Sequence, residues 1–102
     1  MGIISVLFGN NKTDFKSLVE QGALIVDVRS PQEFASGHIA GSVNMPLDSI
    51  SSKIASLTKS GKPVITCCRS GARSGMAQGV LKAAGIAVYN GGAWDSLEQK
   101  IK

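Results

Sequence analysis

The 102-residue chain has few aromatic residues, one histidine and only two cysteines. Its apolar runs are all far shorter than the roughly 20 residues that a membrane-spanning helix needs. The cysteines, Cys67 and Cys68, are adjacent, and neighbouring cysteines rarely pair because their disulfide geometry is strained. One histidine and two adjacent cysteines do not supply the four spaced ligands of a zinc site. We therefore expect no disulfide scaffold, no metal and no cofactor.

Targeting signals are also missing from the N-terminal residues. Ile3 to Phe8 is apolar but short, with no basic residue before it and no small-residue cleavage site. Val6 stands where a myristoylation site needs Ser or Thr. The sequence therefore predicts a cytoplasmic protein that does not bind membranes. We expect residues 1–11 to form a loosely ordered extension and residues 12–102 to form a single domain.

The charge of the chain is mildly basic, at +4. Its lysines are scattered rather than clustered, and nucleic-acid binding surfaces usually carry a basic stripe. The composition is 43% hydrophobic and 18% charged, which is typical of a chain with a folded core. The charge therefore favours a small anionic substrate over nucleic acid.

Apolar strand patterns alternate with helical patterns along the chain. Strands are expected over residues 24–28, 42–44, 64–67 and 86–89, and helices over residues 14–21, 49–57, 74–84 and 94–101. Thr13 and Asp48 are the expected N-caps of two of these helices. Ser30-Pro31-Gln32-Glu33 predicts a further short helix through a capping box, and Asn90-Gly91-Gly92 predicts a turn. This alternation predicts an α/β fold with a central parallel sheet covered by helices on both faces.

Cys68 lies where the strand at residues 64–67 stops and a glycine-containing loop begins. Ligand sites of parallel sheets lie at the carboxyl ends of the strands, and Asp27, Arg29 and Asn90 also follow strands. Loop amides, the following helix N-terminus and nearby arginines all favour a thiolate over a thiol. Cys68 is therefore the candidate nucleophile. The candidate substrate-binding residues, through their amides and cationic side chains, are Arg69, Ser70, Gly71, Ala72, Arg73 and Ser74.

Cys67 and several polar residues have simpler explanations. Cys67 precedes Cys68 within the strand pattern, so its side chain should point to the other face and pack in the core. A resolving thiol is the alternative for Cys67. For Asp27 and Arg29, we expect a local ion pair that supports the loops rather than a catalytic role. Structural roles are also expected for the remaining candidates: hydrogen bonding for His38, helix capping for Glu33 and core packing for Trp94.

Four segments, taken in order, resemble the rhodanese family in its small single-domain form over about residues 13–98. Cys68-Arg69-Ser70-Gly71-Ala72-Arg73-Ser74 is similar to the family's active-site loop. The other three segments are residues 26–34 with Asp-Val-Arg, residues 37–46 with Gly-His-Ile-Ala-Gly, and residues 90–94 with Gly-Gly-Ala-Trp. The sequence departs from the family pattern at two places. The spacing from Gly92 to Trp94 is short, and Ser70 stands where some thiosulfate-using members carry a cation.

This resemblance implies a sulfurtransferase that works through a Cys68 persulfide. The donor would be thiosulfate or a persulfide, and the acceptor a thiol or cyanide. The guanidinium groups of Arg69 and Arg73 would hold the sulfonate of thiosulfate. Oligomeric state and the cellular partners are not predicted by these residues.

Two other functions are possible for a chain with these segments. Cysteine phosphatases of related fold separate Cys and Arg by five residues, whereas here Arg73 follows Cys68 after four. The smaller loop suits one sulfur atom better than a phosphate. The second alternative is a non-catalytic domain that binds proteins or carries sulfur, although such domains usually lack the cysteine.

Overall fold

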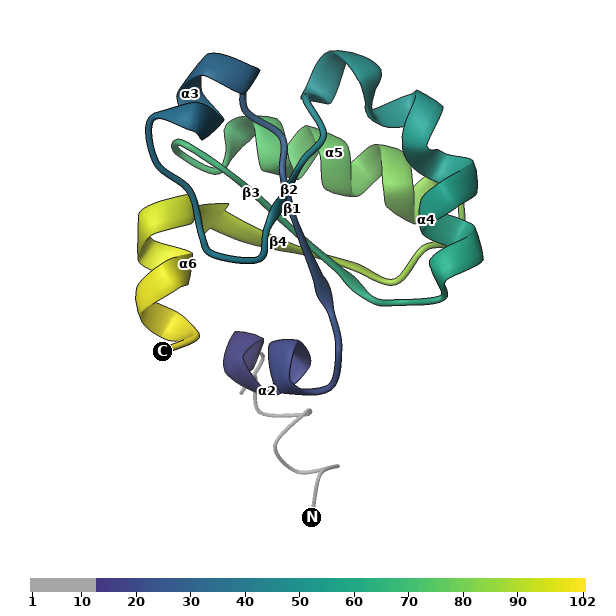
Figure 1. Cartoon of the computed structure of the whole chain (residues 1–102). Coiled ribbons are helices and arrows are strands. Elements are labelled where there is room, and N and C mark those ends of the chain that lie inside the picture. Colours follow the sequence, from purple (N-terminus) through teal and green to yellow (C-terminus); the bar gives the residue numbers. More distant parts are fainter. Residues whose placement is uncertain (1–12) are drawn as a thin grey trace.

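The computed structural model describes residues 13–102, so the predicted extension at residues 1–11 lies outside the described residues (Figure 1). Within residues 13–102 the sheet has four parallel strands in the order β2-β1-β3-β4. The strands are β1 (Leu24–Asp27), β2 (Val43–Asn44), β3 (Val64–Cys68) and β4 (Val88–Ala93). The predicted α/β fold with a parallel sheet is confirmed.

Helices lie on both faces of this sheet. In Figure 1, α5 and α4 lie above the strands, and α2 and α6 lie below them. No helix within residues 13–102 is long and apolar enough to cross a membrane. The helices are α2 (Phe15–Glu20), α3 (Pro31–Ala35), the 3₁₀ helix η1 (Leu47–Lys53), α4 (Ile54–Ser60), α5 (Ala72–Ala83) and α6 (Trp94–Lys100).

The central strand β3 divides the core into two layers, because successive side chains of a strand point to opposite faces. Val64 and Cys68 pack in one cluster with Leu81 of α5. Ile65 and Cys67 pack in the other cluster, which also contains residues of α2 and α6. Every residue of β3 is buried, as expected for a parallel strand covered on both faces. The core packing predicted for Cys67 is confirmed.

Some predicted helix ends need correction. The N-cap of α2 is Asp14 rather than Thr13, because the Asp14 side chain accepts the Ser17 amide at 3.0 Å. Asp48 is not a cap but lies inside η1, where the chain forms a 3₁₀ helix before α4 begins. The helix expected over 74–84 begins earlier, at Ala72, and Gly71 precedes it. The capping box of Ser30 and Glu33 is confirmed.

The predicted turn at residues 90–92 is instead a β-bulge inside β4. Thr66 pairs with Asn90 and Cys68 pairs with Ala93, so three steps along β4 match two steps along β3. The extra residue of β4 lies at the glycine pair, where no side chain interferes with the continued pairing of β4 and β3. Gly92 has a φ of +78°, a conformation that favours glycine. The bulge therefore keeps β4 paired with β3 as far as Cys68.

Candidate active site

Cys68 is the last residue of β3, and a tight loop joins it to α5. Gly71 caps α5 with a φ of +102°, a backbone conformation that other residues adopt only under strain. This turn directs the first amides of α5 back toward the end of β3. Cys68 itself is buried, whereas Arg69 and Ser70, the next two residues of the loop, are exposed.

Hydrogen bonds converge on the sulfur of Cys68. Its Sγ accepts the Gly71 amide at 2.9 Å and the Ser74 amide at 3.4 Å, and the Ser74 hydroxyl lies 3.4 Å away. Burial raises the pKa of the Cys68 thiol, but hydrogen bonds from the Ser74 hydroxyl and from the Ser74, Gly71 and Ser70 amides outweigh it. The pKa of Cys68 therefore lies below its ordinary value. The loop favours a thiolate at the place where the sequence predicts a nucleophile.

The neighbouring cysteine has the opposite environment. Cys67 is fully buried in the layer of α2 and α6. Burial, together with the charge of Asp27, raises the pKa of Cys67 to about 12. A thiol in that state is a poor nucleophile at neutral pH, because the thiolate is the reactive form. The environment of Cys67 does not favour a resolving thiol.

Arg73 lies in the first turn of α5 and forms an ion pair with Glu33 of α3. Its Nη1 and Nη2 donate to the two carboxylate oxygens at 2.7 and 3.0 Å. Glu33 also accepts the Ser30 amide, so one carboxylate caps α3 and joins it to the cysteine loop. The sequence explained Glu33 by the cap alone and missed this pair. The substrate role predicted for Arg73 stays a prediction, and its guanidinium is already paired.

Asp27 and Arg29 form a buried ion pair at the end of β1. Their Nη2–Oδ2 distance is 2.8 Å, and Arg29 Nε contacts both carboxylate oxygens. Arg29 also donates to the Gly37 carbonyl at 2.7 Å and lies over the ring of Trp94, 4.9 Å from its centroid. The predicted local ion pair is confirmed. It joins β1, the segment after α3 and the start of α6.

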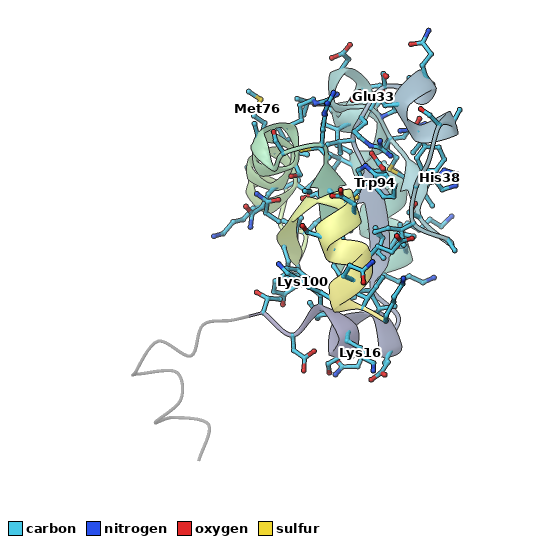
Figure 2. All side chains as sticks on the ribbon, turned by 90° about the vertical axis from the view of Figure 1, so that its left-hand side faces the viewer. Lys16, Glu33, His38, Met76, Trp94 and Lys100 are labelled. Atoms are coloured by element: carbon cyan, nitrogen blue, oxygen red, sulfur yellow. The ribbon has the colours of Figure 1, made fainter. Side chains whose placement is uncertain are left out.

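His38 and Trp94 have structural contacts. His38 Nδ1 lies 2.7 Å from the Phe34 carbonyl, and the two rings stack with their centroids 3.7 Å apart. Trp94 packs against the core layer of α2 and α6. Figure 2 shows Glu33, Trp94 and His38 in the upper part of the molecule, and Lys16 and Lys100 toward the other end. The structural roles predicted for His38 and Trp94 are confirmed.

Two polar side chains support the loop and were not predicted to do so. Thr66, buried in β3, donates to the Ser74 carbonyl at 2.9 Å. Asn90 accepts the Ser74 hydroxyl at 2.7 Å and donates to the Gly71 carbonyl at 3.3 Å. The position of Asn90 after a strand was the available signal. No group of His, Cys, Asp or Glu side chains within residues 13–102 could hold a metal ion.

Comparison with known proteins identifies the family. The model of the Rhodanese-like domain family matches residues 11–96. The chain belongs to this family. Its fold is the rhodanese fold, as the resemblance implied.

Curated relatives share part of the rhodanese-like chain. This chain is 40% identical over 76 residues to the thiosulfate sulfurtransferase GlpE of Pseudomonas syringae. The alignment covers 74% of this chain and 71% of GlpE. The chain is 38% identical over 69 residues to the uncharacterized protein YqhL of Bacillus subtilis, covering 67% of this chain. The match spans 54% of YqhL and 47% of the GlpE of Pseudomonas aeruginosa, about half the length of each.

Solved structures share the fold of this rhodanese-like domain. A rhodanese with anions from Escherichia coli has a TM-score of 0.67 at 29% identity, covering 72% of this chain and 89% of its own. The human single-domain sulfurtransferase TSTD1 has a TM-score of 0.68 at 28% identity, covering 83% of this chain and 89% of its own. The coverage of both chains indicates that this domain corresponds to nearly all of each neighbour.

Proposed function

We propose that the chain is a sulfurtransferase that carries sulfur as a persulfide on Cys68. The observation that carries this proposal is the pair of hydrogen bonds to Cys68 Sγ from the Gly71 and Ser74 amides, with the Ser74 hydroxyl 3.4 Å from the same sulfur. Donors arranged in this way stabilise negative charge on sulfur. Relatives named thiosulfate sulfurtransferase at 40% identity support the same reaction class.

The reaction proceeds in two displacements at sulfur. The Cys68 thiolate attacks the outer sulfur of thiosulfate, forming a new S–S bond. The original S–S bond breaks, and its electron pair leaves with sulfite. An acceptor thiolate or cyanide then attacks the outer sulfur of the persulfide and returns Cys68 to the thiolate. Each step exchanges one bond to sulfur for another, so no external oxidant or reductant is needed, and the kinetics are ping-pong.

The donor is the less constrained part of this proposal. Arg69 is exposed in the loop, whereas the guanidinium of Arg73 is paired with Glu33. We assign the sulfonate of thiosulfate to Arg69 and to the loop amides. Replacing Arg69 with Gln should raise KM for thiosulfate several-fold with little change in kcat, because a screened surface contact acts mainly on binding. An unchanged KM would remove Arg69 from the proposed site.

The test is a thiosulfate:cyanide sulfurtransferase assay combined with intact mass after incubation with thiosulfate. The wild-type protein should gain the mass of one sulfur atom and should turn over. Cys68→Ser should lose both signals. Cys67→Ser is the matched control, because it makes the same substitution one residue away on the other face of the sheet. It should keep both signals.

The other outcomes distinguish the alternatives. Turnover that survives Cys68→Ser would refute the assignment of the nucleophile. If thiosulfate does not transfer sulfur to Cys68, a small-molecule persulfide is the next donor to test. Transfer of sulfur from that persulfide to Cys68 would support Cys68 as the sulfur carrier. If neither donor loads Cys68, the proposal is wrong and the non-catalytic binding module becomes the better explanation.

A further inference from the structure

A hydrogen-bond chain connects the bulge of β4 with the sulfur of Cys68. Gly92 donates its amide to Asn90 Oδ1 at 2.9 Å, and the Ser74 hydroxyl lies 2.7 Å from the same oxygen. The Ser74 hydroxyl also lies 3.4 Å from Cys68 Sγ. Ser74 and Cys68 are fully buried, so the protein supplies these partners. Ser74 therefore stands between an amide oxygen on β4 and the candidate nucleophile.

The orientation of the Asn90 amide follows from its neighbours. The Gly92 amide is a donor, so the Asn90 atom that faces it must be the acceptor, Oδ1. The Gly71 carbonyl is an acceptor, so the atom 3.3 Å from it must be the donor, Nδ2. Rotating the amide by half a turn would break both contacts. Oδ1 therefore faces Ser74, and it can only accept a hydrogen bond from the hydroxyl.

The hydroxyl of Ser74 has one proton and two possible acceptors. While Cys68 is a thiol, the proton goes to Asn90 Oδ1 at the shorter distance, and the thiol can donate to Ser74 Oγ. When the sulfur is anionic it is the stronger acceptor, because hydrogen bonds to charged groups are about twice as strong as neutral ones. The hydroxyl then rotates toward Sγ, and Asn90 Oδ1 retains the Gly92 amide. No proton passes between the residues, because the thiol proton leaves to water.

We propose that Asn90 is a positioning residue that regulates the ionisation of Cys68 by competing with its sulfur for the hydroxyl proton of Ser74. The competition opposes the thiolate, since forming it breaks the hydrogen bond between Ser74 and Asn90. The loop amides stabilise the thiolate, and Asn90 limits how far that stabilisation goes. The proposal rests on the proposed function only in taking the Cys68 thiolate as the working form.

Other ionisable side chains lie on β3 and on the elements around it. The experiment leaves all of them unchanged except Cys67, which is removed from every protein compared. The charged and titratable side chains on the elements packed around Cys68 are Asp27 and Arg29 after β1, Glu33 of α3, Asp48 and Lys53 of η1, Lys59 of α4, Cys67 of β3, Arg69 of the loop, Arg73 and Lys82 of α5, and Tyr89 of β4.

The test is a double-mutant cycle on the ionisation of Cys68. Four proteins carry Cys67→Ala: the parent, Asn90→Ala, Ser74→Ala and the double variant of Asn90 and Ser74. Thiolate absorbance in the ultraviolet gives the pKa of Cys68 in each. Asn90→Ala should lower that pKa, raising the ratio of thiolate to thiol about five- to tenfold at a fixed pH, because the hydroxyl is released to the sulfur. In the Ser74→Ala background, the same change should have no effect.

This cycle separates competition from simple support of the loop. If Asn90 only holds the loop through the Gly71 carbonyl, removing it raises the pKa of Cys68 in both backgrounds and the proposal is wrong. The titration needs no sulfur donor, so it remains decisive if sulfur transfer is never observed.

A second variant covers the case in which Asn90→Ala does not fold. A Cβ at Gly75 would lie 3.3 Å from Asn90 Nδ2, so Gly75→Ala should displace the amide slightly. It should lower the pKa of Cys68 by a smaller amount that again depends on Ser74. An unchanged or raised pKa in Gly75→Ala would count against the proposal.

Discussion

Arg73 and Glu33 are joined by two parallel hydrogen bonds, although 40 residues separate them in sequence. The pair connects α3 to the first turn of α5, directly beside the loop that holds Cys68. The hydrogen bond from Arg73, with a further contribution from the Ser30 amide, lowers the pKa of Glu33 to about 2. The carboxylate therefore stabilises the fold only while it is ionised.

The low pKa of Glu33 predicts how stability depends on pH. Because the folded pKa is about 2 and the ordinary value is 4.5, this stabilisation is complete above about pH 4.5 and is lost as the pH falls toward 2. Glu33→Gln keeps the capping box but removes the charge. The variant should be less stable at neutral pH and should lose less stability between pH 5 and pH 2. Urea unfolding across this range measures both effects.

An equal decline in both proteins over that range would show that Glu33 does not carry the pH dependence. The expected difference is modest, because the two side chains are 36% and 31% exposed and water screens the pair. High salt should reduce it further.

Gly91 in the bulge of β4 should not tolerate a side chain. A Cβ there would lie 2.8 Å from Leu97 Cδ2 and 2.9 Å from both Ile65 Cγ2 and the Thr66 carbonyl. Gly91→Ala should therefore destabilise the protein by about 1 to 3 kcal/mol, as overpacking does in other cores. Urea or thermal unfolding measures the loss.

Gly79 in α5 is the matched control for Gly91. A Cβ there has no neighbour within 4 Å, so Gly79→Ala should stabilise the protein by about 0.5 to 1 kcal/mol through helix propensity. Equal effects of the two substitutions would mean that the bulge can relax.

Much of this architecture could be predicted from local sequence patterns. The apolar run at residues 64–67 and the capping box of Ser30 identified β3 and α3, because burial and capping depend on neighbouring residues. The bulge at residues 90–92 could not be predicted, because a glycine pair is equally typical of a turn. Whether the chain turns there depends on pairing with β3, which is a long-range contact.

Only part of the candidate site could be predicted from the sequence. Cys68 and its loop are contiguous in sequence, so the candidate nucleophile and the amides that bond to it could be predicted together. The partners of the loop come from other elements, Glu33 from α3 and Asn90 from β4. A single sequence gives the position of such residues at strand or helix ends, but the fold decides which side chains they contact.

The two cysteines should differ sharply in reactivity. The pKa of Cys68 is lowered by its loop, whereas burial raises the pKa of Cys67 to about 12. A small alkylating reagent at neutral pH should therefore modify Cys68 and leave Cys67 unmodified in the folded protein. Peptide mass mapping locates the label. Both cysteines should react in denaturant, and prompt labelling of Cys67 in the native protein would contradict the structural role assigned to it.

Asp27 should matter for stability more than an exposed acidic residue does. Its carboxylate is fully buried, and it is the counter-charge of Arg29, which is 5% exposed. Asp27→Asn should cost about 3 to 5 kcal/mol, because it leaves a buried guanidinium without an opposite charge. Adding Arg29→Met should recover part of the loss, since the double variant buries no charge. Urea unfolding of Asp27→Asn, Arg29→Met and the double variant tests this order. If Arg29→Met instead adds its full cost to that of Asp27→Asn, the contacts of Arg29 with the Gly37 carbonyl and the Trp94 ring outweigh the ion pair.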